Sequence, residues 1–75
     1  MSQREKIMKG VKEFSPDEIK KLRERLGATQ EVFADIVGVG KIQVSRWEND
    51  NARPRNIARR EMQRIENELD EIEND

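Results

Sequence analysis

Apolar side chains recur at intervals of three and four residues through most of this chain, and that spacing predicts helices rather than strands. The first helix is predicted from Pro16 to about Leu26. Ser15 and Glu18 supply the S-x-x-E pattern of a capping box at its start, and Gly27 follows its end in the usual position of a C-terminal glycine. The start and stop signals therefore agree with the hydrophobic spacing.

Residues 30–49 are predicted to form two short amphipathic helices joined by a tight turn. Ala34 falls where the two helices would cross, and a larger side chain there would push them apart. Gly38 falls where the backbone reverses, and a positive φ at that position favours glycine. A small residue at the crossing, a turn glycine and apolar inner faces are together typical of a DNA-binding helix-turn-helix. The side chains predicted to be buried in this unit are Phe33, Val37, Val44 and Trp47.

A longer helix is predicted from about Asn56 to Glu73, after Pro54 has ended the preceding segment. Its apolar residues form a heptad-like stripe at Ala58, Met62, Ile65, Leu69 and Ile72. In the preferred interpretation the first two close the core of the domain, while Ile65, Leu69 and Ile72 form a dimer interface with a second copy of the chain. In the alternative, the whole stripe packs on its own domain. A different, basic protein is a further candidate partner, because the helix ends in acidic residues.

The chain has 75 residues, which is enough for one domain. Hydrophobic residues make up 33% of it and charged residues 41%, so the core is small and dimerisation would add stability. Cysteine and histidine are absent, which excludes disulfides, metal sites built on thiolates or imidazoles, and catalysis by those side chains. No metal or cofactor is predicted. An enzyme is the least favoured class, because nothing in the sequence holds two carboxylates in a sheltered pocket.

Residues 1–14 are predicted to form an arm that precedes the domain of residues 15–75. In this arm, Ile7, Val11 and Phe14 have the spacing of a frayed helical turn or of an arm folded onto the body. No apolar run approaches the ~20 residues of a membrane span, and no signal peptide precedes the charged N-terminus. A cytoplasmic protein without a membrane partner is therefore expected.

The net charge of −1 averages two segments of opposite charge. Residues 1–64 contain all 15 Lys and Arg and 10 acids, a net charge of +5, whereas residues 65–75 contain 6 acids and no base. This distribution favours nucleic acid as a partner of the first segment. The densest basic stretch comprises Arg53, Arg55, Arg59, Arg60 and Arg64.

The polar residue types on the second helix of residues 30–49 suit the major groove of DNA. Arg and Lys donate to guanine O6 and N7, Gln pairs with adenine, and Ile contacts a thymine methyl. Thr29 and Gln30, at the start of the first helix, would face phosphate, helped by the helix dipole. Arg53 and Arg55 would bind phosphate without reading sequence. For each side chain the alternative is simple solvation of a helix face. The predicted base-reading residues are Lys41, Ile42, Gln43, Ser45, Arg46 and Asn49.

The segment LRERLGATQEVFADIVGVGKIQVSRWENDNARP resembles the XRE-type helix-turn-helix family, which includes the lambdoid phage repressors and Cro. The resemblance implies an all-α, compact, lambda-repressor-like DNA-binding domain of four to five helices with a longer C-terminal helix. It also implies that Arg23 pairs with Glu48, that Gln30 contacts phosphate, and that bases are read from the positions of Lys41, Ile42 and Arg46. The residues that carry the resemblance are Leu22, Arg23, Leu26, Thr29, Gln30, Phe33, Ala34, Gly38, Val39, Val44, Ser45, Arg46, Trp47, Glu48 and Pro54.

The sequence departs from the family's pattern in three places. Gly40 stands where Ser or Thr commonly caps the recognition helix, and Gly is a weaker cap. Asp50 replaces the usual Gly after the Trp-Glu pair, so Asp50 or a neighbouring Asn is predicted to adopt the left-handed conformation. Asn51 and Ala52 stand where basic residues are common, which reduces the phosphate contact expected of this loop.

Three functions are compatible with these features. The preferred one is a sequence-specific transcriptional regulator, a small homodimeric repressor that occupies a palindromic operator on double-stranded DNA. The second is an antitoxin that binds a toxin protein and represses its own operon, since the one-domain plan is similar to that of XRE-type antitoxins. The third is a protein-interaction module without DNA binding, which the presence of Lys41, Gln43 and Arg46 disfavours.

Overall fold

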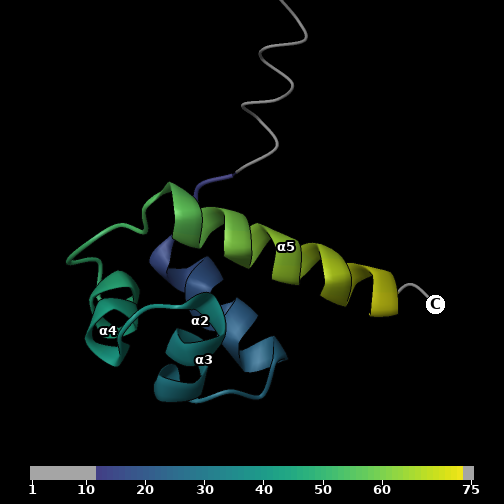
Figure 1. The fold of residues 1–75 in the computed structure, drawn as a ribbon, viewed down its shortest axis with the longest axis horizontal. Coiled ribbons are helices and arrows are strands. Elements are labelled where there is room, and N and C mark those ends of the chain that lie inside the picture. The colour runs from purple at the N-terminus through teal and green to yellow at the C-terminus, as the bar shows by residue number, and fades with distance from the viewer. Residues whose placement is uncertain (1–11, 74–75) are drawn as a thin grey trace, which may run out of the picture.

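The computed structural model describes residues 12–73, which form four helices and no strand. The helices are α2 (Pro16–Arg25), α3 (Gln30–Val37), α4 (Lys41–Glu48) and α5 (Asn56–Glu73). In Figure 1, α5 crosses the top of the molecule and the other three helices lie beneath it, with α4 at the end where α5 begins. The expected all-α fold is confirmed, and the helix bounds agree with the predicted ones to within one or two residues.

The start of α2 is closed by the predicted capping box. The Glu18 backbone N–H donates to Ser15 Oγ at 3.1 Å, and the Ser15 backbone N–H donates to Glu18 Oε1 at 2.9 Å. The bond from the Ser15 backbone is the main reason that the pKa of the Glu18 carboxyl lies below its ordinary value. The helix ends at Arg25, and Gly27 then turns the chain with a φ of 67°.

A second pair of local signals sets the bounds of α3. Thr29 Oγ1 accepts a hydrogen bond from the Val32 backbone N–H at 3.1 Å, which caps the start of the helix. At its end Gly38 has a φ of 91°. The backbone N–H groups of Gly38 and Val39 both donate to the Ala34 carbonyl, at 2.8 and 2.9 Å. The left-handed glycine predicted at the reversal is therefore present.

The two departures from the family's pattern that flank α4 have visible structural effects. Gly40 precedes the helix in an extended conformation and provides no side-chain hydrogen bond to its first turn. After the helix, Asp50 has a φ of 61°, so the left-handed residue predicted in this loop is Asp50 itself. Among residues 12–73, Asp50 is the only non-glycine residue with a positive φ.

The core lies where α5 covers the other three helices. Phe33, Val44 and Met62 are each 0% exposed. Ala34 is 1% exposed in α3, which packs against α4 more extensively than any other pair of described helices pack together. A small side chain is needed at such a contact, as predicted. The buried members of the core are Phe14, Ile19, Leu22, Phe33, Ala34, Val37, Val44, Trp47, Ala58, Met62 and Ile65.

The expectation for the second half of α5 needs one correction. The sequence places Ile65 at a dimer interface, but its side chain is only 5% exposed and belongs to the core of its own protomer. Ile65 follows the buried Met62 by three residues and so lies on the same face of α5, which still packs on the body there. On this part of the helix Lys12 pairs with Glu66 at 3.1 Å. Leu69 is partly buried against the same core, and only Ile72 is largely exposed, at 69%.

The described part of the N-terminal segment packs on the body. Phe14 is 5% exposed and joins the core, and the ammonium group of Lys12 lies 4.9 Å from the centre of its ring. This agrees with the packed alternative for Phe14. Ile7 and Val11 lie outside the described residues.

Candidate nucleic-acid interface

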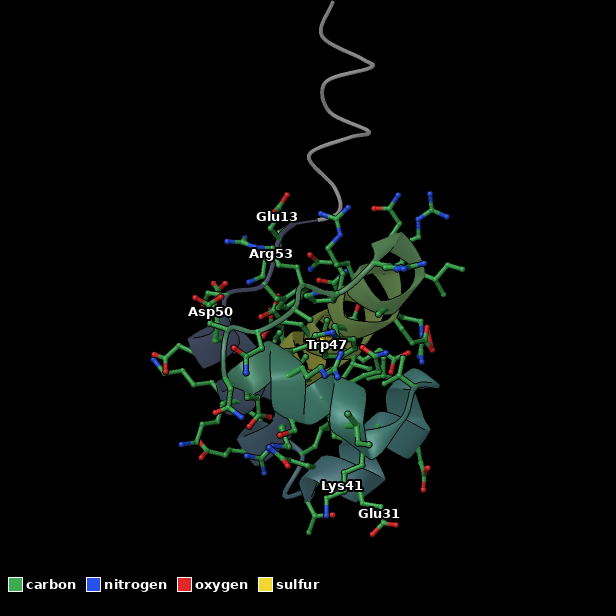
Figure 2. All side chains as sticks on the ribbon, turned by 90° about the vertical axis from the view of Figure 1, so that its left-hand side faces the viewer. Glu13, Glu31, Lys41, Trp47, Asp50 and Arg53 are labelled. Carbon is green, nitrogen blue, oxygen red and sulfur yellow. The ribbon has the colours of Figure 1, made fainter. Side chains whose placement is uncertain are left out.

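The recognition helix α4 has one face in the core and one in solvent. Val44 and Trp47 are 0% and 3% exposed, so the helix cannot rotate about its axis without unpacking both side chains. Figure 2 looks onto the outer face of α4, with Trp47 behind the helix and Lys41 at its start. The exposed residues within α4 are four of the six predicted readers: Lys41, Ile42, Gln43 and Arg46.

Lys41, Gln43 and Arg46 keep their donors available. Within the described part of the chain, none of these side chains makes a hydrogen bond or an ion pair. Ile42 is 70% exposed, although exposing an isoleucine side chain to water is unfavourable. The outer face of α4 thus offers cationic and amide donors next to an apolar group, the combination that base edges in a major groove can use.

Ser45 and Asn49, the other two predicted readers, are partly engaged with each other. The Asn49 side-chain amide donates to the Ser45 carbonyl at 2.9 Å and lies 3.4 Å from Ser45 Oγ. Ser45 is also half-buried. These contacts satisfy the C-terminal end of α4, so Ser45 and Asn49 have less freedom to contact bases than the other four predicted readers.

Glu48 connects three helices at the end of α4. Arg23 of α2 donates to both of its carboxylate oxygens, from Nε at 2.7 Å and from Nη2 at 3.1 Å. Gln30 of α3 donates to Glu48 Oε1 at 3.1 Å. The Arg23 and Glu48 side chains are only 16% and 7% exposed. The Arg23–Glu48 pair implied by the family resemblance is present, and its fork geometry fixes the orientation of α4 on the body.

Two opposing effects act on the Glu48 carboxyl. Burial alone would raise its pKa, but the hydrogen bonds from Arg23 and then Gln30, with the charge of Arg23, outweigh burial and lower it. Glu48 is therefore ionised at neutral pH. The resemblance implies a phosphate contact for Gln30, whereas here the Gln30 amide nitrogen donates to Glu48. The sequence reasoning missed this bond, because three-way contacts depend on how the helices pack.

The start of α3 retains unsatisfied backbone donors. Thr29 Oγ1 accepts from the Val32 N–H, and the Thr29 carbonyl accepts from the Phe33 N–H. The N–H groups of Gln30 and Glu31 precede these bonds and lack helical acceptors, as first-turn donors must. Together with the helix dipole they give the start of α3 a partial positive charge.

Arg53 and Arg55, the predicted phosphate contacts after α4, lie in the loop that leads to α5. This loop and α4 border an open depression of about 720 Å³ whose lining contains no acidic side chain. Its floor includes Trp47 and Ala58. The polar groups at its border come from both α4 and the loop: Gln43, Arg46, Arg53 and Arg55.

The basic stretch predicted after the helix-turn-helix does not act as one patch. Arg64 pairs on its own helix with Glu61 at 2.7 Å and Glu68 at 2.9 Å, which neutralises it locally. Arg53 and Arg59 instead lie within ion-pair distance of Glu13, at 3.8 and 3.5 Å. Among the described cations without an ion pair, Lys41 and Arg46 lie on α4 and Arg55 in the loop after it, whereas Lys20 and Arg60 lie on α2 and α5.

The acidic end of α5 is likewise partly neutralised. Arg25, at the end of α2, lies 3.0 Å from both Asp70 and Glu73. Lys12 reaches Glu66 from the N-terminal side. The charge pattern of the sequence suggested a separate acidic end, but these pairs attach it to the body. They join residues far apart in the chain, so spacing could not reveal them.

Comparison with known proteins identifies the family. The family model described as helix-turn-helix matches residues 19–73. The chain belongs to the XRE-type helix-turn-helix family. Membership in this family supports a DNA-binding transcription regulator in general. No curated protein and no solved structure gives a significant match.

Two other kinds of feature, a metal-binding cluster and a membrane-spanning helix, are absent from residues 12–73. These residues contain no group of three potential metal-ligating side chains. None of α2 to α5 combines the length and the apolarity needed to cross a bilayer.

Proposed function

We propose that this XRE-type protein is a sequence-specific repressor that reads DNA by placing α4 in the major groove. The observation that carries the proposal is the outer face of α4, where Lys41, Gln43 and Arg46 keep unpaired donors while Val44 and Trp47 hold the helix in the core. A helix held in this way presents its polar side chains at fixed positions, which base recognition requires.

Each group on this face has a matching partner in the groove. Arg46 donates two hydrogen bonds to guanine O6 and N7, Lys41 donates to the same acceptors, and Gln43 pairs with adenine. Ile42, which is 70% exposed in the free protein, contacts a thymine methyl. These base contacts make the protein specific for its operator sequence.

Phosphate contacts on either side of α4 hold the protein in register. The free N–H groups at the start of α3 bind one phosphate, and Arg53 and Arg55 bind others at the opposite end of α4. The depression between α4 and the loop, which has only basic and neutral lining, leaves room for the sugar–phosphate backbone. These contacts add affinity on any sequence.

The repressor acts as a homodimer on a palindromic operator, with half-sites about 10 bp apart or a multiple of that. No effector domain is needed if the dimer represses by occupying the promoter. The promoter of its own gene is the first candidate, since autoregulation needs no further component.

The decisive experiment is a gel shift and footprint on the DNA upstream of the gene, with wild type and Arg46→Ala at physiological salt. Wild type is expected to protect a short palindromic site. Arg46→Ala should lose about 10- to 100-fold in operator affinity, because one bidentate contact carries about 1–3 kcal/mol of discrimination.

Arg64→Ala serves as the matched control, since Arg64 is an exposed arginine that pairs with Glu61 and Glu68 on its own helix. It should bind the operator almost as wild type does. Operator binding that is unchanged by Arg46→Ala would show that α4 does not read the DNA as proposed. Absence of any specific complex would reject the repressor itself.

A further inference from the structure

Three charged residues meet at the margin of the proposed interface. Glu13 Oε1 lies 3.8 Å from Arg53 Nη1, and Glu13 Oε2 lies 3.5 Å from Arg59 Nη1. Figure 2 shows Glu13 beside Arg53, above the outer face of α4. Together with Phe14 and Pro54, they line a second depression of about 190 Å³. One carboxylate thus sits between two arginines from different segments.

The two arginines differ in how firmly they are held. The Arg59 side chain is 22% exposed, and its Nη2 donates to Asn56 Oδ1. Its Nε is buried and has no hydrogen-bond partner among residues 12–73, so this guanidinium is incompletely satisfied. The Arg53 side chain is 80% exposed and can move. The cluster therefore combines one fixed and one adaptable cation.

Glu13 is a weakly held occupant of this cluster. Its side chain is 73% exposed, and both of its distances to arginine exceed the 2.7–2.9 Å of a good charge-assisted hydrogen bond. Its neighbour Phe14 is buried, so the backbone holds the carboxylate near the arginines while the side chain remains free to leave. A stronger anion can replace it at little cost.

We infer that Arg53 and Arg59 form a phosphate-binding site for the DNA backbone, and that Glu13 fills this site when no DNA is bound. The inference rests on the proposed function, because the phosphate is that of the bound duplex. A backbone phosphate presents anionic oxygens to the same guanidinium donors. Glu13 then competes with DNA inside the molecule and lowers the affinity for every duplex, since a phosphate contact carries no sequence information.

The test compares Glu13→Gln with wild type on two duplexes of equal length, one from the DNA upstream of the gene and one with that sequence scrambled. Glu13→Gln should bind both duplexes about two- to fivefold more tightly at low salt, the scale of one exposed ion pair. The slope of log affinity against log salt concentration should be more negative by up to about one, as for one additional phosphate contact. The ratio of the two affinities should not change.

Three further comparisons separate this local effect from the general loss of a negative charge. Asp17→Asn removes a carboxylate that is also largely exposed and that pairs, among residues 12–73, with Lys21 alone; it should change affinity less than Glu13→Gln does. In an Arg53→Gln background, Glu13→Gln should lose most of its effect. Arg59→Gln should weaken binding more in the Glu13→Gln protein than in wild type, with folding checked by Trp47 fluorescence.

The outcomes distinguish the two proposals. If wild type binds neither duplex, the proposed function fails and the phosphate site fails with it. If wild type binds DNA but Glu13→Gln does not tighten binding, or tightens it equally in the Arg53→Gln background, only the phosphate site is rejected.

Discussion

Glu48 is the residue whose side chain connects α2, α3 and α4. It belongs to α4 and receives hydrogen bonds from Arg23 of α2 and Gln30 of α3. The outer face of α4 and the start of α3 are thereby held relative to each other through one carboxylate. Its environment also makes it ionised at neutral pH, since hydrogen bonding outweighs burial in its effect on the pKa.

Replacing Glu48 with Gln should therefore lower stability by about 1–3 kcal/mol at pH 7, because Arg23 would lose its counter-charge in a mostly buried site. The pKa of Glu48 is lower in the folded chain than its ordinary value of 4.5. Its contribution is thus complete above about pH 5 and is lost as the pH falls through the folded pKa. Urea unfolding at several pH values, followed by Trp47 fluorescence, measures both effects.

The fully exposed Glu71 provides the control, as Glu71→Gln should unfold almost as wild type does. Between pH 5 and 3 the wild type should lose stability more steeply than Glu48→Gln. Parallel curves for these two proteins would show that Glu48 does not contribute to the acid sensitivity of the fold.

The turn between α3 and α4 is formed by backbone groups, with Gly38 in the left-handed conformation. Gly38 has a φ of 91° and Gly40 a φ of −86°, although both stand in the same short connection. A Cβ built at either position meets no atom within 4 Å. A loss of stability on substitution at either position would therefore come from the φ angle rather than from collision.

Gly38→Ala should destabilise the protein by about 1–2 kcal/mol, the cost of forcing an L-residue into the left-handed region. Gly40→Ser, at the matched position with negative φ, should be neutral or stabilising by a few tenths of a kcal/mol, because it adds the missing cap of α4. Thermal unfolding of the two variants beside wild type makes the comparison. Equal loss of stability in both would contradict this account of the turn.

At the scale of the whole molecule, the direction of α5 limits how two copies can share one operator. In Figures 1 and 2, α4 covers the end of the molecule where α5 begins, and the far end of α5 points away from that side. A twofold axis that presents both α4 helices to one DNA duplex then runs roughly along α5. We therefore expect the two α5 helices of a dimer to lie side by side in the same direction.

Ile72 is the exposed apolar residue of this far end, and a parallel arrangement brings the two copies of it together. Because the chain has no cysteine, Ile72→Cys introduces a single reactive group. Under mild oxidation it should form a disulfide-linked dimer, with a higher yield when the operator duplex is present. Non-reducing gel electrophoresis measures the product.

Lys21→Cys, with an exposed side chain on α2, is the matched control and should cross-link poorly. Failure of Ile72→Cys to cross-link above this level would remove the far end of α5 from the dimer interface. The acidic residues beside Ile72 repel their copies in a parallel dimer, so added salt should favour the cross-link.

The helices, their ends and most of the core residues could be predicted from the sequence alone. Ser15, Thr29 and Gly38 act on backbone groups within a few residues, so their effects can be derived without knowing the fold. The buried positions of α3 and α4 likewise follow from helical spacing. The family resemblance added the Arg23–Glu48 pair, which spacing alone would not have revealed.

The other contacts between residues far apart in the chain could be identified only from the folded structure. Ile65 and Ile72 are the same residue type on one stripe of α5. Ile65 is in the core and Ile72 is in solvent, because the last turns of α5 extend beyond the core. Gln30 donates to Glu48, and Glu13 lies between Arg53 and Arg59, for the same kind of reason. Such contacts depend on distances between elements, which hydrophobic periodicity does not encode.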